Sequence, residues 1–318
     1  MKKVAIIYGG IGEEADVSIS SAKNVLENID SSKFYVLEVF VDKNKNFVIN
    51  DIVFNEQDGI NEIKKQKVDV IFPIIHGKYG EDGELQKKLE ENNLKFVGSS
   101  SISSSITIDK NKTNKILKEN GVNIPQSKII SAYADRTKDD FTISFNFPIV
   151  VKPIDEGSSV DLFKFENEEG YKNSLDKIFK NHKEMLVQEF VEGREFTCGV
   201  IEIKNEVIAL VPTEIILTKG NLFDYEAKYT VGGCEEITPA QINEELTNKI
   251  KDLVIFCHKI LGCKSISRTD MILCNDKLYV LEINTSPGMT KTSFIPAQAK
   301  FCGYDMKELI SLVIDGVN

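Results

Sequence analysis

Strand-length apolar runs alternate with helical patterns through the first hundred residues of this chain. The runs KVAIIYG, FYVLEVFVD and VDVIFPII have the length and apolar content of buried strands. The segments VSISSAKNVLENI and GELQKKLEENN predict helices, and KFVGSS predicts a further short strand. Strands and helices that alternate in this way are typical of an open, mainly parallel sheet covered by helices. The sequence therefore predicts an α/β fold for this region.

Two further α/β regions follow, and their patterns of predicted strands and helices differ from that of the first. A serine-rich connection after residue 100 leads into a helix that Gly121 is placed to end. Strand patterns and one helix, GYKNSLDKIFKN, continue to about residue 190, after which strands dominate and two helical stretches flank them. We therefore expect a mixed α/β chain of three domains, at residues 1–100, 101–190 and 191–318.

The composition narrows the class of protein. Of 318 residues, 42% are hydrophobic and 28% are charged, which is ordinary for a globular protein. Acidic residues outnumber basic ones by 49 to 39, and a formal charge of −10 argues against nucleic acid or an anionic membrane as partner. The N-terminus lacks a secretory signal, and no apolar run approaches the roughly 20 residues that span a bilayer. Six cysteines without C-x-x-C spacing predict reduced thiols and a cytoplasmic location.

The segment SISRTDMILCNDKLYVLEIN predicts two antiparallel strands joined at Asn275 and Asp276. A three-residue loop would set Asp270 opposite Glu282, whereas a two-residue loop would send these carboxylates to opposite faces. Asp270, Glu282 and Asn284 are hard oxygen donors of the kind that Mg²⁺ prefers beside phosphate oxygens. The alternative is a polar sheet edge with an ion pair from Arg268. Because like charges destabilise a sheet unless a cation lies between them, the pattern favours the metal and the three-residue loop.

The segment GIGEEA at residues 10–15 leaves a second interpretation open. It fits the G-x-G-x-x-A pattern of dinucleotide-binding enzymes, and Asp42 ends a later strand. However, Glu13 and Glu14 would stand at the helix N-terminus, where a pyrophosphate should bind. Two carboxylates there oppose an anion and suit an ammonium group. Binding of NAD would support this dinucleotide alternative.

Four motifs, in order, carry a resemblance to a known family. They are IHGKYGEDGELQ (75–86), VVKPIDEGSSV (150–160), FDYEAKY (223–229) and RTDMIL followed by VLEINTSPGMT (268–290). The chain resembles the ATP-grasp ligases over nearly its whole length, and the residues of the motifs are most similar to those of the D-alanine–D-alanine ligases. This resemblance implies an ATP-grasp fold of three domains, with ATP between the central and C-terminal domains. It also implies two Mg²⁺ ions (or Mn²⁺), a homodimer, and a role in supplying peptidoglycan precursors.

The resemblance implies a role for each of a set of nucleotide-binding residues. Two lysines would contact the phosphates and adenine, a glycine–serine loop would cover the phosphates, and a strand end would bind adenine and ribose. In that order, these residues are Lys110, Lys152, Gly157, Ser159, Gln188, Glu189, Phe190, Val191 and Glu195. Asp270, Glu282 and Asn284 would hold the metal ions.

The resemblance also implies two steps, in which ATP phosphorylates one D-alanine and the amine of a second D-alanine displaces the phosphate. Catalytic roles fall on residues that hold the first ammonium group, close the site or face the oxyanion: Glu14, Ser158, Tyr229, Arg268 and Gly288. Further substrate contacts are implied for His76, Lys228, Ser293 and Phe294. His76 would lie near the substrate amine, although an isolated histidine is more often a hydrogen-bonded loop residue.

Four positions depart from the family pattern. Ala15 stands where arginine is usual, Asp161 replaces a glycine after EGSSV, Phe294 replaces leucine, and Gln188 replaces an acid. If position 161 needs a positive φ, aspartate tolerates it better than most residues. These departures leave open an ATP-grasp ligase with another acceptor, such as D-serine, D-lactate or another amino acid, or an inactive nucleotide-binding relative. Tyr229 argues against lactate, and the complete metal set argues against inactivity.

Overall fold

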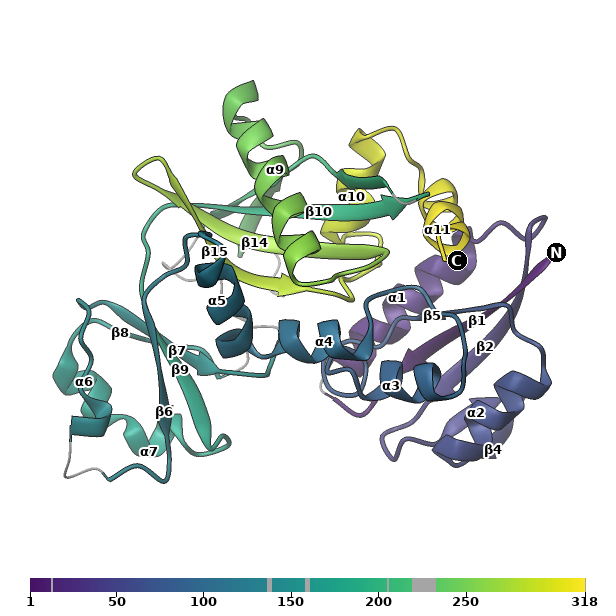
Figure 1. Ribbon diagram of the computed structural model, residues 1–318, viewed down its shortest axis with the longest axis horizontal. Helices are drawn as coiled ribbons and strands as arrows, with labels where there is room; N and C mark the ends of the chain where they lie inside the picture. Colours follow the sequence, from purple (N-terminus) through teal and green to yellow (C-terminus); the bar gives the residue numbers. More distant parts are fainter. Residues whose placement is uncertain (13, 136–138, 158–160, 205, 219–232, 318) are drawn as a thin grey trace.

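The computed structural model describes residues 1–12, 14–135, 139–157, 161–204, 206–218 and 233–317. The chain forms three lobes, each built on a sheet of its own (Figure 1). The first lobe and the second lie at opposite ends of the molecule, and the third lies along both of them. Helix α4 runs between the first two lobes, so the chain passes from one to the other beneath the third.

The first lobe is the predicted mainly parallel sheet. Strand β1 pairs in parallel with β2 on one side and β5 on the other, and β3 and β4 extend the sheet in antiparallel fashion, in the order β4-β3-β2-β1-β5. The KFVGSS segment forms only an isolated bridge between Ile71 and Phe96, not a strand. The elements are β1 (Lys2–Gly9), α1 (Ala15–Asn28), β2 (Phe34–Val41), β3 (Phe47–Ile49), β4 (Ile52–Phe54), α2 (Glu56–Lys65), β5 (Val70–Pro73) and α3 (Glu84–Glu91).

The serine-rich connection forms two helices where the sequence predicted one. Asp109 has extended backbone angles, and its carboxylate accepts hydrogen bonds from the N–H groups of Asn111 and Lys112. An aspartate with this geometry is an N-cap, so it ends α4 (Ser101–Ile108) and begins α5 (Lys110–Glu119). The cap sets Lys110 as the first residue of α5, where its backbone N–H donates to the carbonyl of Ile154.

The second lobe has an antiparallel sheet in the order β6-β9-β7-β8, with short helices on one face. The predicted helix over GYKNSLDKIFKN is divided at Ser174 into two pieces that together cover the core around Tyr171. The elements are β6 (Ser127–Ser131), the 3₁₀ turn Asp139–Phe141, β7 (Ile149–Pro153), β8 (Phe163–Phe165), α6 (Glu168–Asn173), α7 (Leu175–Ile178) and β9 (Glu184–Glu189).

The third lobe is a six-stranded antiparallel sheet in the order β13-β12-β10-β14-β15, with β11 also paired to β10. Helix α9 packs on this sheet, and α11 packs against α1, which joins the cores of the first and third lobes. The elements are β10 (Arg194–Ile203), β11 (Glu206–Ala209), β12 (Thr213–Leu217), β13 (Cys234–Ile237), α9 (Glu244–Ile260), β14 (Ile266–Cys274), β15 (Lys277–Asn284), α10 (Phe294–Phe301) and α11 (Met306–Asp315). Within the described ranges, the helices lack the length and apolar character needed to cross a membrane.

Candidate active site

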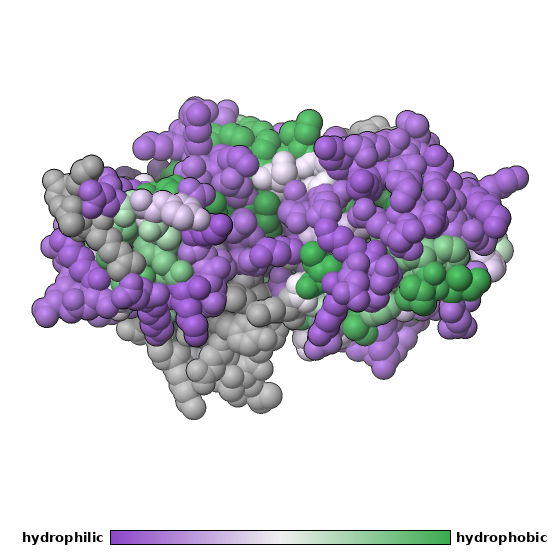
Figure 2. Space-filling model, turned by 90° about the horizontal axis from the view of Figure 1, so that it is seen from below, coloured by the Kyte–Doolittle hydropathy of each residue, from purple (hydrophilic) through white to green (hydrophobic). Residues whose placement is uncertain are grey.

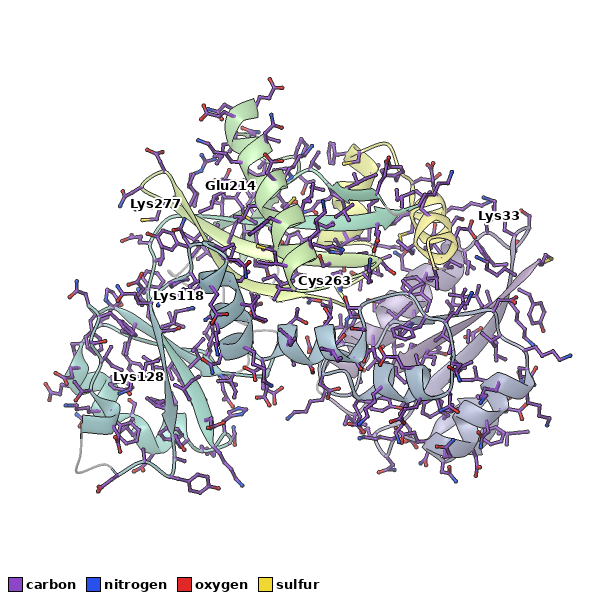
Figure 3. The ribbon with its side chains drawn as sticks, in the orientation of Figure 1. Lys33, Lys118, Lys128, Glu214, Cys263 and Lys277 are labelled. Atoms are coloured by element: carbon purple, nitrogen blue, oxygen red, sulfur yellow. The ribbon has the colours of Figure 1, made fainter. Side chains whose placement is uncertain are left out.

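The β14–β15 hairpin pairs the residues that the sequence analysis expected, but by a different route. Asp270 lies opposite Glu282 and Arg268 opposite Asn284. The predicted three-residue loop is wrong, because Cys274 pairs with Lys277 across a two-residue turn whose residues both have positive φ. Lys277 lies at this outer end of the hairpin (Figure 3). A β-bulge at Leu281 adds one residue to β15 and restores the register before Glu282.

The carboxylate of Asp270 is already engaged by protein donors. Arg268 donates from Nε and Nη2 to its two oxygens at 2.9 and 2.8 Å, and Thr197 donates from Oγ1 at 2.6 Å. The ion pair between Arg268 and Asp270, which the sequence analysis gave as the alternative to a metal site, is therefore present. An ionised carboxylate offers about four lone-pair sites, so three bonds leave room for one metal contact.

Glu282 and Asn284, the other two predicted metal ligands, also have protein partners. Lys110 Nζ lies 3.8 Å from Glu282 Oε2, and Asn284 Oδ1 accepts the backbone N–H of Ser286 at 2.9 Å. In the described part of the chain, no group of three or more His, Cys, Asp or Glu side chains could hold an ion. Two carboxylates and an amide fit Mg²⁺ only when phosphate oxygens complete its shell, which is the usual arrangement in nucleotide sites.

A cavity of about 460 Å³ separates the second lobe's sheet from the third lobe's sheet. It is large enough for a nucleotide, and its walls carry both charged and apolar side chains. Among the residues that line it are Lys110, Lys152, Gly157, Gln188, Glu189, Phe190, Val191, Glu195, Asp270 and Glu282. The described residues predicted to bind the nucleotide, with Asp270 and Glu282 of the predicted metal ligands, therefore lie around one space, whereas Asn284 is not part of its lining. Ser159 lies outside the described residues.

Lys110 lines the part of the cavity that lies beside the carboxylate hairpin. Its side chain is 8% exposed, and Nζ donates to the carbonyl of Glu156 at 2.6 Å. Helix α5 therefore ties the base of the glycine–serine loop to the carboxylate hairpin through one ammonium group. A buried lysine between an acidic hairpin and a glycine turn is suited to a phosphate.

The opposite end of the cavity is formed where β9 leaves the second sheet. Gln188 is 3% exposed, and its Nε2 has no hydrogen-bond partner among the described residues. A buried amide with an open donor suits a polar ligand edge. Lys164 Nζ lies 4.0 Å from the centre of the Phe190 ring, so a cation covers one part of that aromatic surface.

Arg268 is buried beside the hairpin and faces several carboxylates. Burial alone would lower the pKa of Arg268, but the charge of Asp270, with those of Glu282 and Glu81, raises it above its ordinary value. The guanidinium group therefore stays charged. The centre of the Phe294 ring lies 5.6 Å from Cζ of Arg268. The phenylalanine that replaces leucine therefore packs on the guanidinium group that is predicted to stabilise the oxyanion.

The turn after β15 brings Gly288 and Ser293 together. A Cβ atom at Gly288 would come within 2.7 Å of Ser293 Oγ, a distance that real Cβ atoms do not reach. Ser293 Oγ also accepts the backbone N–H of Thr290 at 3.0 Å and precedes α10. The absence of a Cβ atom at Gly288 allows this close approach, and the neighbour is a predicted contact to the second substrate.

His76 is held by hydrogen bonds at both ring nitrogens. Nδ1 lies 2.8 Å from the carbonyl of Ser286 and Nε2 lies 3.2 Å from Ser21 Oγ. Because a carbonyl only accepts, Nδ1 carries the proton and Nε2 accepts from the serine. Burial lowers the pKa of His76 to about 4, so the ring is neutral at pH 7. The structure therefore gives His76 the contacts of a fixed, uncharged link between the first lobe and the turn after β15.

Glu14 lies between the first lobe and the glycine–serine loop. A Cβ atom at Gly77 would come within 2.6 Å of Glu14 Oε2, and one at Gly157 within 3.2 Å. Nearby, Lys78 Nζ pairs with a carboxylate oxygen of Glu156 at 2.6 Å. These contacts bring the predicted ammonium-binding residue and the predicted phosphate-covering loop to one place.

Asp161 has φ +49, so the position does adopt the left-handed conformation that the sequence analysis considered. Its Oδ2 accepts from Asn181 Nδ2 at 3.0 Å and lies 2.8 Å from His182 Nε2. The hydrogen bond of Asn181 is the largest cause that lowers the pKa of Asp161. The departure from glycine therefore supplies an anchor at this end of the loop. Ser158, Lys228 and Tyr229, the other predicted catalytic and substrate residues, lie outside the described residues.

The sequence analysis missed Glu81 and the apolar walls of the cavity. Burial and the charge of Glu14 raise the pKa of Glu81 to about 8, and a perturbed carboxyl beside a cleft indicates a functional site. The motif at 75–86 contains Glu81, but its polar letters are typical of a surface loop. The cavity walls include Ile215, Ile272 and Leu281, whose apolar character is indistinguishable from that of core strand residues.

Comparisons with known proteins agree with this geometry. Residues 3–99 match the family model "D-ala D-ala ligase N-terminus" and residues 116–315 match "D-ala D-ala ligase C-terminus". A D-alanine–D-alanine ligase of Oceanobacillus iheyensis is 36% identical over 99% of this chain and 94% of its own.

Solved structures give the same result. The VanG D-Ala:D-Ser ligase of Enterococcus faecalis matches with a TM-score of 0.85 and 28% identity, over 99% of this chain and 98% of its own. A D-alanine–D-alanine ligase of Bacillus anthracis complexed with ATP matches with a TM-score of 0.80 and 26% identity, over 99% of this chain and 96% of its own. The fold is therefore an ATP-grasp fold, and the chain belongs to the D-alanine–D-alanine ligase family.

Proposed function

We propose that this protein joins two D-alanines into D-alanyl-D-alanine for peptidoglycan synthesis, with cleavage of ATP to ADP and phosphate. The observation that carries the proposal is the paired Asp270 and Glu282 at the mouth of a nucleotide-sized cavity. The full-length similarity to ligases of this activity supports the same conclusion. The dinucleotide alternative has no comparable support. Glu14 is the N-cap residue of α1 and lies close to Gly77, so a carboxylate stands where the pyrophosphate would have to bind.

In the first step the carboxylate of one D-alanine attacks the γ-phosphorus of ATP, and ADP leaves as the acyl phosphate forms. Glu14 holds the ammonium group of this D-alanine. Lys110 and Lys152 hold the nucleotide and its phosphates, and Glu195 holds the ribose. Most of the catalysis here is positioning and charge stabilisation, since the protein forms no covalent bond.

The residues Asp270, Glu282 and Asn284 would hold two Mg²⁺ ions, and Mn²⁺ has similar oxygen-ligand preferences. When bound, such ions supply positive charge that offsets the phosphate oxygens. Arg268 adds a permanent positive charge on the same side of the site, and the bulge at Leu281 keeps both carboxylates on one face.

In the second step the amine of the second D-alanine attacks the acyl carbonyl, and phosphate leaves after the tetrahedral intermediate forms. Arg268 and the N–H of Gly288 stabilise the oxyanion of that intermediate. Ser293 and Lys228 contact the carboxylate of the second substrate, and Phe294 limits its pocket. Ser158 and Tyr229 close the site with Glu14, and His76 fixes the turn after β15 beside it.

The partners follow from the same activity. The substrates are ATP and D-alanine, the precursor pathway places the enzyme in the cytoplasm, and the three lobes act as domains at 1–100, 101–190 and 191–318. We also infer a homodimer. Ile52 and Val53 on edge strand β4 are 58% and 64% exposed. Apolar atoms gather on the first lobe in the view of Figure 2, and an exposed apolar edge of this kind is suited to pairing. Light scattering would test the dimer.

Phosphate release with a panel of D-alanine, D-serine, D-lactate and other amino acids tests the proposal. We expect D-alanine to give the largest kcat/KM, and mass spectrometry to identify the dipeptide. A larger value with D-serine would favour the alternative suggested by the VanG similarity and by Phe294. ATP binding without ADP release on any substrate would mean that the protein is an inactive relative.

A further inference from the structure

The turn of residues 76–83, between β5 and α3, has an unusual backbone. It is left-handed at three positions, with φ +67 at Gly77, +73 at Tyr79 and +89 at Gly83. Tyr79 is fully buried, and a bulky residue rarely adopts a positive φ unless surrounding contacts hold it there. Specific bonds must therefore fix this turn.

Two neighbouring carboxylates provide those bonds. Glu81 Oε2 accepts the backbone N–H of Gly77 at 2.6 Å, and the backbone N–H of Glu81 donates to the carbonyl of Gly77 at 2.8 Å. Asp82 Oδ2 accepts the backbone N–H of Tyr79 at 2.7 Å. The two carboxylates differ in setting, because Glu81 is only 6% exposed and its Oε1 has no hydrogen-bond partner among the described residues.

Three successive residues of this turn each lie against a different part of the site. His76 bonds the carbonyl of Ser286, and Lys78 pairs with the carboxylate of Glu156. Gly77 lies so close to Glu14 that a Cβ atom at position 77 would come within 2.6 Å of Oε2. The three residues reach the turn after β15, the start of α1 and the base of the glycine–serine loop. A shift of this turn would therefore move elements of all three lobes relative to one another.

Two charged groups of the proposed site act on Glu81. The charge of Glu14 raises the pKa of Glu81, and that of Arg268 lowers it. A buried carboxylate is costly in the absence of bonds or opposite charge, so its retention at this point indicates a role in the site.

We propose that Glu81 is a positioning residue for the first substrate: its buried carboxylate fixes Gly77, and through Gly77 the ammonium-binding Glu14. The role rests on the proposed ligase function, since it assigns the amine of the first D-alanine to Glu14. Glu81 itself does not touch the reacting atoms. It acts through the turn, so its loss should weaken binding of the first D-alanine far more than binding of ATP.

Two variants test the hydrogen bond between Glu81 and Gly77. Glu81→Ala removes the acceptor of the Gly77 N–H, and we expect the KM for the first D-alanine to rise about 100-fold, the scale of a 1 Å misplacement. Glu81→Gln keeps an amide oxygen as acceptor, so we expect a rise of only about 10-fold, a partial rescue. The KM for ATP should stay within about threefold in both variants, because the cavity lining does not include the turn.

Asp82→Asn is the matched control. Asp82 holds the same turn and also accepts the N–H of Glu84 at 2.9 Å, but its bonds do not reach Gly77. We expect less than a threefold change in either KM. If Asp82→Asn gave the same pattern as Glu81→Ala, Glu81 would be a structural residue of the turn and the proposal would fail.

Hydrogen–deuterium exchange of the ligand-free protein gives a readout that needs no substrate. In Glu81→Ala, peptides that cover residues 76–81 and 284–289 should both exchange faster than in the wild type and in Asp82→Asn. Faster exchange confined to residues 76–81, or an unchanged KM for the first D-alanine, would overturn the proposal. If the wild type did not use D-alanine at all, the proposed function would fail, whereas spread of the exchange to residues 284–289 would still support positioning.

Discussion

The nucleotide cavity and the turn at residues 76–83 treat their charges in opposite ways. In the cavity, charged side chains meet opposite charges, as in the pair of Arg194 and Glu214 at 2.7 and 2.8 Å. At the turn, His76 is 5% exposed and Glu81 is 6% exposed. Burial moves the pKa of His76 down to about 4 and that of Glu81 up to about 8.

This difference follows from what each region must do. A triphosphate with its metal ions brings its own charge and must leave after each turnover, so the cavity needs charged groups that can exchange protein partners for ligand oxygens. The turn has to keep one geometry, and buried groups with fixed partners hold geometry best. Changes in the cavity should therefore alter ligand binding and leave the fold intact, whereas changes near the turn should alter geometry and stability together.

Asp270→Ala should have the largest effect. It removes one proposed metal ligand and both hydrogen bonds that hold the Arg268 guanidinium group, so turnover should fall by more than about 10³-fold. Leu281→Ala keeps the register and removes only one apolar wall of the cavity, so its KM for ATP should rise less than about tenfold.

Activity in both variants is measured as phosphate release per folded molecule, with the folded fraction taken from circular dichroism. Wild-type turnover in Asp270→Ala would mean that Asp270 neither holds a metal ion nor positions Arg268.

Glu282→Ala should lower kcat by about 10³-fold with little change in the unfolding free energy. The side chain is partly exposed in the cavity, and the neighbouring Lys110 keeps its hydrogen bond to the carbonyl of Glu156 when the carboxylate is removed. Glu206→Ala is the matched control, because Glu206 is an exposed glutamate on strand β11 of the same sheet. Phosphate-release kinetics and urea unfolding measure both quantities. Unchanged kcat would reject the metal assignment.

The hairpin shows how far the sequence could predict this site and why it could go no further. The facing of Asp270 and Glu282 was predicted because like charges opposite one another require a cation. The route to it was not, because a bulge at an apolar residue such as Leu281 leaves no mark in the alternation of side chains. Asn275 and Asp276 favour a two-residue turn, and only the bulge reconciles that turn with the metal chemistry.

The same limit applies elsewhere in the chain. The mainly parallel first sheet was predictable because its strands are apolar throughout, whereas the small β3 and β4 are too short to give a pattern. Glu81 was missed because its pKa depends on burial and on the charges of Glu14 and Arg268, which are distant in the sequence. A functional carboxylate in a polar turn becomes visible only when the lobes are assembled.

Glu81→Gln should change how stability depends on pH. In the folded protein Glu81 has a pKa of about 8, whereas the ordinary value is 4.5, so between these values the folded state holds a proton that the unfolded state has lost. The contribution of Glu81 is therefore fully present below about pH 4.5 and is lost as the pH rises through 8. The unfolding free energy of the wild type should fall relative to Glu81→Gln, by at most about 1.4 kcal/mol per pH unit.

Urea unfolding of both proteins at pH 5, 6.5 and 8 measures this difference, and the shared contributions of His76, Glu14 and Arg268 cancel in the comparison to first order. Parallel curves would mean that Glu81 titrates normally and that the turn resembles the cavity.

Loss of the ion pair between Lys78 and Glu156 should give the smallest effect, although this pair links the turn to the cavity. It joins the buried turn to the loop beside the cavity, but the Lys78 side chain is 54% exposed. Pairs of this kind contribute about 0.2–1 kcal/mol, so Lys78→Ala should lower kcat/KM for D-alanine by less than about fivefold, and less still in high salt. Lys78→Glu should be worse than alanine, and adding Glu156→Lys should restore part of the loss. If the exchanged pair restored nothing, the contact between turn and loop would depend on Gly77 and Gly157 packing against Glu14 rather than on charge.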